Sequence, residues 1–121
     1  MARNWEIFDI GPRGENDLHV TLGNKSNLMI GRAAFIRLGE PDAVMLMYEG
    51  ESGMIGVRGV HRRSEHAFVL QVPERGKHRL VWALRFCKRH GISVDQTARF
   101  RSAVMEDGVL VLDTNSLVNI K

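Results

Sequence analysis

The residues with the clearest chemical potential are basic side chains in the second half of the chain. Residues 75–101 contain eight Lys or Arg and one acidic residue, Asp95. Such side chains neutralise phosphates, and arginine also reads base edges in a DNA groove. We therefore predict a binding site for a polyanion, with a solvated basic surface as the alternative. The candidate contact residues are Arg75, Lys77, Arg79, Arg85, Lys88 and Arg89.

The net charge of +3 is unevenly distributed along the sequence. Residues 1–60 carry six basic and eight acidic side chains, whereas residues 61–121 carry eleven basic and six acidic ones. One-sided clustering of this kind is the electrostatic footprint expected of a nucleic-acid site. The charge pattern therefore places the candidate site in the second half.

Other chemistry-bearing patterns are weak. The sequence has no HxH, HExxH or GxxxxGK[ST] motif, and a single cysteine is too few for a structural zinc site. Cys87 and His90 have the spacing of a nucleophile and its base on a helix, but a small buried thiol explains Cys87 with fewer assumptions. We therefore expect a non-enzymatic protein without a metal or another cofactor.

Large apolar side chains allow two interpretations. Trp5, Trp82 and Phe100 have rings that stack on bases in single-strand binders, although core positions are the commoner use of such residues. We interpret the methionines as core filler, with a binding groove as the alternative, because their flexible side chains fit irregular gaps. These are Met29, Met45, Met47 and Met54.

Length and composition are those of one soluble globular domain. The chain has 121 residues, of which 44% are hydrophobic and 26% charged. The N-terminus lacks the apolar core of a secretion signal, and no apolar run approaches the roughly 20 residues of a membrane span. A lone thiol suits a reducing compartment. We expect a cytoplasmic protein that does not enter a membrane.

The elements that must position the basic residues follow an order that occurs twice. A short apolar run, a brief helix ending in glycine, a strand and a hairpin partner are predicted at residues 28–30, 32–38, 43–48 and 54–58, and again at 80–82, 83–90, 98–105 and 109–113. The closing glycines, Gly39 and Gly91, are 52 positions apart, and the turn glycines, Gly53 and Gly108, are 55 apart. This order predicts one mostly β domain, residues 1–121, with two short helices and internal repeats at 18–58 and 68–113.

Several local features complete this prediction. The apolar run 43–48 is typical of a strand buried on both faces. In the second helix we expect Ala83, Leu84 and Cys87 to form the inward stripe. Further strands are predicted at residues 3–10, 68–72 and 117–120.

The first repeat resembles a known family. Residues 30–47, IGRAAFIRLGEPDAVMLM, resemble the AbrB/MazE/SpoVT swapped-hairpin domain, with Leu38-Gly39 and Asp42-Ala43 where that family places its helix end and next strand. Members are usually short chains that interlace as homodimers and bind DNA as transcriptional regulators or antitoxins. The resemblance implies a β-barrel-like pseudo-dimer in one chain, acting as a monomer or forming a homo-oligomer, with double-stranded DNA as its partner.

The two repeats differ at the positions that the family uses for DNA. In the first repeat Phe35 and Ile36 occupy the places of the family's helical Arg pair. In the second, Lys77 and Arg79 fall at the turn and Lys88 at one of the helix positions. The resemblance thus implies an asymmetric DNA face. A structural or protein-interaction module of the same fold is the alternative, and a small-molecule or catalytic site between the halves is a third option.

Overall fold

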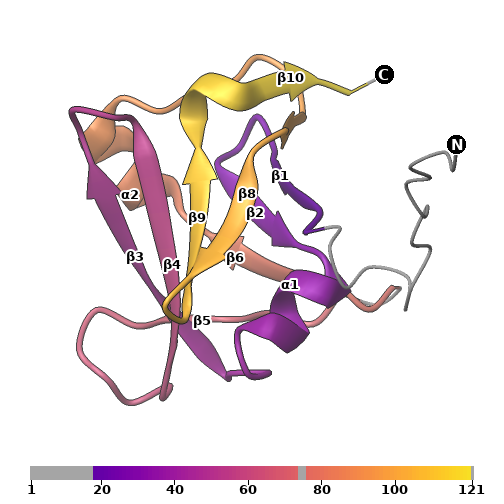
Figure 1. Ribbon diagram of the computed structural model, residues 1–121, viewed down its shortest axis with the longest axis vertical. Helices are drawn as coiled ribbons and strands as arrows, with labels where there is room; N and C mark the ends of the chain where they lie inside the picture. The colour runs from indigo at the N-terminus through magenta and orange to yellow at the C-terminus, as the bar shows by residue number, and fades with distance from the viewer. Residues whose placement is uncertain (1–17, 74–75, 121) are drawn as a thin grey trace, which may run out of the picture.

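The computed structural model describes residues 18–73 and 76–120 (Figure 1), so the strand predicted at residues 3–10 lies outside the described part. The protein is mostly β, as predicted, with two short α-helices. Neither helix is long and apolar enough to cross a membrane, and no other helix in these two ranges is. The elements are β1 (Val20–Leu22), β2 (Asn27–Ile30), α1 (Arg32–Arg37), β3 (Ala43–Glu49), β4 (Met54–Val60), β5 (Phe68–Val69), β6 (Arg79–Trp82), α2 (Leu84–His90), β7 (Ala98–Phe100), β8 (Ala103–Glu106), β9 (Val109–Asp113), the 3₁₀ turn η1 (Thr114–Ser116) and β10 (Leu117–Asn119).

The strands form two antiparallel five-stranded sheets. Sheet A has the order β10-β7-β1-β2-β6, and sheet B has the order β5-β3-β4-β9-β8. Each sheet takes strands from both halves of the sequence, because β2 pairs with β6 in sheet A and β4 pairs with β9 in sheet B. In Figure 1 the strands β4, β9 and β8 lie in front and β6 crosses behind them.

The hydrophobic core lies between the two sheets. Alternate residues of each strand point inward, as the two-residue period of a strand requires. In sheet B the inward pairs are Val57 with Leu110 and Ile55 with Leu112, all of them buried. Sheet A contributes a matching layer to the same core. Its fully buried large side chains are Val20, Leu22, Ile30, Val81 and Phe100.

The helix ends and the β8–β9 turn occur at the glycines that the sequence predicts. Gly39 and Gly91 follow the two helices with φ of +91° and +66°, the left-handed conformation that commonly ends a helix. Asp107 and Gly108 form the two-residue β8–β9 turn with φ of +51° and +80°, and a pair of positive φ angles matches the twist of a tight hairpin. These boundaries follow from glycine's tolerance of positive φ.

One predicted strand is wrong as a single element. Residues 98–105 form two strands, β7 in sheet A and β8 in sheet B, with a break at Arg101 and Ser102. The Arg101 N–H donates to the Ser116 carbonyl, and the Ser102 carbonyl accepts from the Asp113 N–H, both at 3.1 Å. These bonds to distant residues let the chain leave one sheet and enter the other.

Burial also differs from the predictions at three places. In β3 only Ala43 and Val44 are buried, because the outer face of sheet B is partly open to solvent. The strand predicted at residues 68–72 covers Phe68–Val69 only, with an isolated bridge from Gln71 to Leu80. The four methionines interpreted as core filler are half-buried, and none is in the buried core: Met29, Met45, Met47 and Met54.

Two valines of sheet B give a matched test of the core. Val57 in central β4 is fully buried, whereas Val104 in edge strand β8 is 45% exposed. We expect Val57→Ala to lower the free energy of unfolding by about 2 kcal/mol, from lost burial and the cavity left behind. Val104→Ala should cost less than about 0.5 kcal/mol. Urea unfolding followed by circular dichroism measures both, and equal losses would contradict the assigned faces of sheet B.

Candidate nucleic-acid interface

Helix α2 carries three of the predicted contact residues and is held in place by the first half of the chain. Seven residues are too few for a helix that is stable alone. At its start the Ala83 N–H donates to the Ser26 carbonyl at 2.9 Å. On its inner side the rings of Phe86 and His90 pack on Tyr48 of β3, with centroid distances of 6.3 and 4.5 Å. Contacts with β1–β2 and β3 therefore fix the orientation of α2.

The outer side of α2 is basic. Arg85, Lys88 and Arg89 are exposed, and the helix contains no acidic residue. The predicted inward stripe is wrong at Leu84, which is 48% exposed. The inward positions are instead Ala83, Cys87 and, in part, Phe86, because the helix turns this side towards Ser26 and Tyr48.

The turn between β1 and β2 lies beside the start of α2 and carries a further exposed cation, Lys25. Ser26 contacts the start of α2 through its carbonyl, so the preceding residue, the exposed Lys25, lies near the helix. Trp82 pairs with Asn27 at the same end of β6 and is 51% exposed. The position of Lys25 beside α2 depends on contacts between residues almost 60 positions apart, so the sequence alone did not reveal it. We define the basic face as Lys25, Arg85, Lys88 and Arg89.

The remaining predicted contact residues do not join the basic face. Lys77 is exposed in the loop before β6, and Arg79 is the first residue of that strand. Strand β6 separates them from α2, which follows its other end (Figure 1). Arg75 lies outside the described residues. The structure therefore brings together three of the six predicted side chains.

Arg79 has a packing role. Its guanidinium lies over the ring of Phe35 in α1, with the central carbon 4.3 Å from the ring centroid. Its Nη1 donates to the carbonyls of Lys77 and His78, each at 3.2 Å. A guanidinium in this position links the second half to α1 through a cation–π contact.

The Cys87–His90 pair lacks the features of a nucleophile and base. The Cys87 side chain is 2% exposed, and burial raises its pKa, although a hydrogen bond with Ser26 partly opposes the shift. The His90 ring packs on Tyr48 at a tilt and on Phe86 edge-to-face, with centroid distances of 4.5 and 4.8 Å. A buried, protonated thiol is a poor nucleophile. Within the described ranges, no group of three or more His, Cys, Asp and Glu side chains is placed to hold a metal ion.

A hollow of about 330 Å³ lies where the two halves meet beside α1. Its lining combines apolar side chains with Glu40, Asp42, Arg62 and Arg79, so it presents charges of both signs. The hollow therefore favours no single class of small ligand, and the basic face remains the stronger candidate site.

Comparisons of this chain with known protein families, with curated proteins and with solved structures found no match. The site is accordingly assigned from its own chemistry.

The contact between Arg79 and Phe35 predicts a measurable coupling. Arg79→Ala, Phe35→Leu and the double variant form a thermodynamic cycle for the free energy of unfolding. We expect a coupling of about 0.5–1 kcal/mol from the lost cation–π contact. Lys77→Ala, an exposed neighbour, should change stability by less than about 0.5 kcal/mol. A coupling of zero would mean that the guanidinium is not stabilised by the ring.

The raised pKa of Cys87 predicts a loss of stability in alkali. The unfolded chain ionises its thiol before the folded chain does, so stability is complete below the unfolded-state pKa and is lost as pH rises towards the folded-state pKa. Relative to Cys87→Ala, the native chain should therefore lose free energy of unfolding above a pH of about 8.5. Urea unfolding of both proteins at a series of pH values tests this, and a pH-independent difference between them would be contrary to it.

Proposed function

We propose that this chain is a non-enzymatic protein that binds double-stranded DNA through the basic face. The observation that carries the proposal is the exposure of Arg85, Lys88 and Arg89 on a helix without acidic residues, next to Lys25. A helix of seven residues is about 10 Å long. The major groove of B-DNA is about 12 Å wide and admits an α-helix, whose cations neutralise the flanking phosphates.

We further propose that the chain is a tandem, single-chain relative of the AbrB-like swapped-hairpin domain. The ends of the two helices support this, because their hydrogen bonds recur 52 positions apart. The Phe35 N–H donates to Gly31 as the Cys87 N–H donates to Ala83, all at 2.9 Å. Beyond the helix, the Glu40 N–H donates to Phe35 at 3.0 Å as the Ile92 N–H donates to Cys87 at 2.9 Å. Equal helix ends at a constant offset are expected of a duplicated unit.

Contacts between the halves support an interlocked arrangement. Tyr48 of the first half packs on α2 of the second, and Arg79 of the second half packs on α1 of the first. The hairpins β3–β4 and β8–β9 lie side by side through the β4–β9 pairing. In this proposal the second half replaces the partner subunit of a homodimer, so one chain completes both sheets.

The proposed DNA face is asymmetric. At the offset of 52, Lys88 of α2 corresponds to Ile36 of α1, which is exposed and carries no charge. Arg85 corresponds to Ala33, whereas Arg89 corresponds to Arg37, so α1 matches one of the three cations of α2. Helix α2 would therefore make most of the contacts with the duplex, which favours phosphate-driven binding of limited sequence specificity.

Salt dependence and charge reversal test the DNA proposal. If the four cations of the basic face each neutralise one phosphate, a plot of log affinity against log salt should have a slope of about −3 to −4. Reversal of three of them, Arg85→Glu/Lys88→Glu/Arg89→Glu, should weaken binding by about 100-fold or more at about 50 mM salt. Fluorescence anisotropy with a labelled random duplex measures both quantities.

The matched control reverses three exposed arginines elsewhere, Arg62→Glu/Arg63→Glu/Arg101→Glu, and changes the net charge by the same amount. This control should keep most of the affinity, since counterion release depends on contacts rather than on net charge. Equal losses in the two triple variants, or no binding by the native chain at low salt, would refute α2 as a DNA-contacting helix.

A protein-interaction module is the second candidate function. An apolar groove on the outer face of sheet B, rimmed by carboxylates, favours it. The groove is separate from the basic face, so this function does not depend on DNA binding.

A further inference from the structure

Sheet B has an apolar groove on its outer face. One row of neighbouring residues crosses the four strands, Met47 of β3, Gly56 of β4, Val111 of β9 and Val104 of β8. These positions alternate with the inward residues of the core, so their side chains face solvent. The groove has a volume of about 440 Å³, and its lining comes from strands and from the β3–β4 turn.

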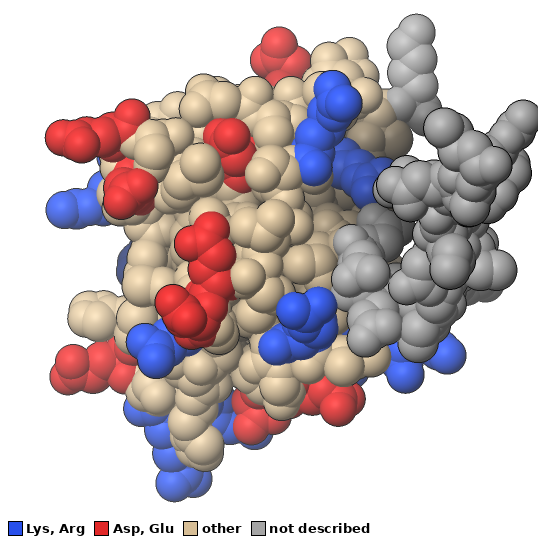
Figure 2. All heavy atoms as spheres, viewed as in Figure 1, with Lys and Arg blue, Asp and Glu red and all other residues tan. Residues whose placement is uncertain are grey.

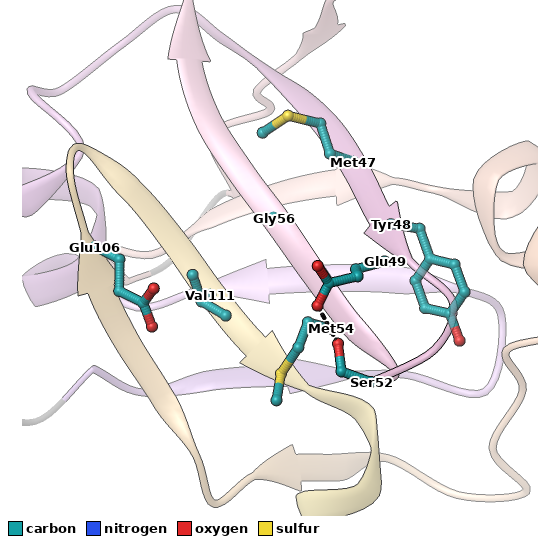
Figure 3. Close-up of a pocket in the computed structure, with 8 residues that line it drawn as sticks. All are labelled: Met47, Tyr48, Glu49, Ser52, Met54, Gly56, Glu106 and Val111. Carbon is teal, nitrogen blue, oxygen red and sulfur yellow. Dashed lines mark hydrogen bonds between the residues drawn. The ribbon is translucent and has the colours of Figure 1, made fainter.

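Gly56 forms the floor of the groove. A Cβ atom at this position would lie 3.2 Å from Met47 Cε and 3.3 Å from Val109 Cγ1, so even alanine would crowd its neighbours. Because Gly56 of central strand β4 has no side chain, the flanking Met47 and Val111 become the walls of a depression. Met54 contributes a further apolar wall at the end near the turn (Figure 3). The groove can therefore accept apolar side chains from outside.

Methionine is an unusual choice for a solvated sheet face. Strand surfaces that stay in water normally carry polar or β-branched side chains. Met45, Met47 and Met54 are instead half-buried on this face. Unbranched thioether side chains adapt their shape and are over-used at surfaces that bind apolar side chains of partners. This composition indicates a docking surface.

The rim of the groove is acidic. Glu49 of β3 and Glu106 of β8 approach from opposite sides, with Met54 and Val111 between them (Figure 3). The Ser52 hydroxyl donates to the Glu49 carboxylate, and no Lys or Arg within residues 18–73 and 76–120 lines the groove. Acidic and basic side chains are both scattered over the otherwise uncharged surface on this side of the molecule (Figure 2). Arg58 lies one row further along β4, beside Met45 and Val109.

We propose that this groove binds a basic amphipathic segment of a partner protein. Apolar side chains of the segment would enter between Met47, Met54 and Val111, and its Lys or Arg side chains would pair with Glu49 and Glu106. This is the helix-in-groove mode of recognition, in which apolar anchors provide affinity and flanking charges fix orientation.

Charge complementarity selects this occupant. Nucleic acid and anionic lipid would be repelled by the two carboxylates, and an acidic peptide would be repelled in the same way. A segment that is apolar but uncharged would leave the carboxylates without partners. A basic amphipathic segment satisfies both the walls and the rim of the groove.

A designed peptide tests the proposal directly. The probe is a fluorescein-labelled Leu/Lys peptide with leucines at i, i+3, i+4 and i+7, and its control is a peptide of equal composition in scrambled order. We expect the amphipathic peptide to bind the native chain at least ten times more tightly than the scrambled one, because only the first presents an apolar face. Equal affinities would overturn the proposal.

Two double variants locate the site. Glu49→Lys/Glu106→Lys reverses the rim, whereas Glu51→Lys/Glu65→Lys makes the same change of charge at exposed positions outside the lining. The rim variant should lose at least tenfold in affinity for the amphipathic peptide, and the control variant should lose less than threefold. Equal losses would show attraction by net charge alone and would overturn the assignment. Because the rim variant leaves Lys25, Arg85, Lys88 and Arg89 unchanged and adds positive charge, it should not lose DNA affinity, so the two proposals fail separately.

Methionine methyl resonances give a readout that needs no variant. In ¹³C-methyl-labelled native protein, peptide binding should shift Met47 and Met54, which line the groove, and leave Met29 of sheet A unchanged. Equal shifts at Met29 would place the peptide elsewhere and overturn the proposal. Sedimentation of the native chain alone tests whether a second copy of the chain occupies the groove. Self-association of the native chain that is lost in the rim variant would mean that a second copy fills the groove, and it would overturn the proposal of a partner segment.

Discussion

The pairing of β4 with β9 is the constraint on which the rest of the structure depends. It joins five residue pairs from Met54↔Asp113 to Arg58↔Val109 and places Val57 and Leu110 together in the core. Without this pairing, β4 and β9 would each become an unpaired edge strand. Exposed edge strands of this kind are prone to aggregation. Sheet A has the same dependence, since β6 and β7 of the second half flank β1 and β2 of the first. Neither half contains a complete sheet.

This shared construction explains how two short helices become fixed. A helix of six or seven residues gains too few internal hydrogen bonds to offset the cost of nucleation. Helix α1 is capped by Gly39 and covered by the guanidinium of Arg79, while α2 is capped by Gly91 and packed on Tyr48. In both cases the stabilising side chain comes from the other half. The cations of α2 therefore owe their orientation to residues of the first half.

The sequence predicts features that local chemistry controls. The helix ends at Gly39 and Gly91 and the Asp107-Gly108 turn follow from the few backbone conformations open at those residues. The edge strand near the C-terminus is also present as β10. Contacts between distant residues decide the rest. The break at Arg101–Ser102 depends on Ser116 and Asp113, and an unbroken run of strand-forming residues gives no sign of it.

The candidate site was predictable only in part for the same reason. Residue type and helical spacing identify Arg85, Lys88 and Arg89, because all three side chains project from the solvent-exposed side of α2. Residue type also predicts Lys77 and Arg79 as contact residues, but they lie at or just before the start of β6, away from α2. Whether Arg79 meets phosphate or an aromatic ring depends on where α1 lies, and spacing along the second half contains no information about α1.

The methionines show how burial and function separate on a sheet. Hydrophobic type predicts a core position, but sheet B has two faces, and register decides which face each residue joins. The pairing of Met47 with Gly56 assigns Met47 to the outer face, whereas the pairing of Tyr48 with Ile55 turns Tyr48 towards the core layer. Tyr48 thus reaches Phe86 and His90 of α2 and also borders the groove. The packing that supports α2 and the wall of the proposed peptide groove therefore use adjacent residues of one strand, Tyr48 and Met47, and a substitution of Tyr48 affects both surfaces.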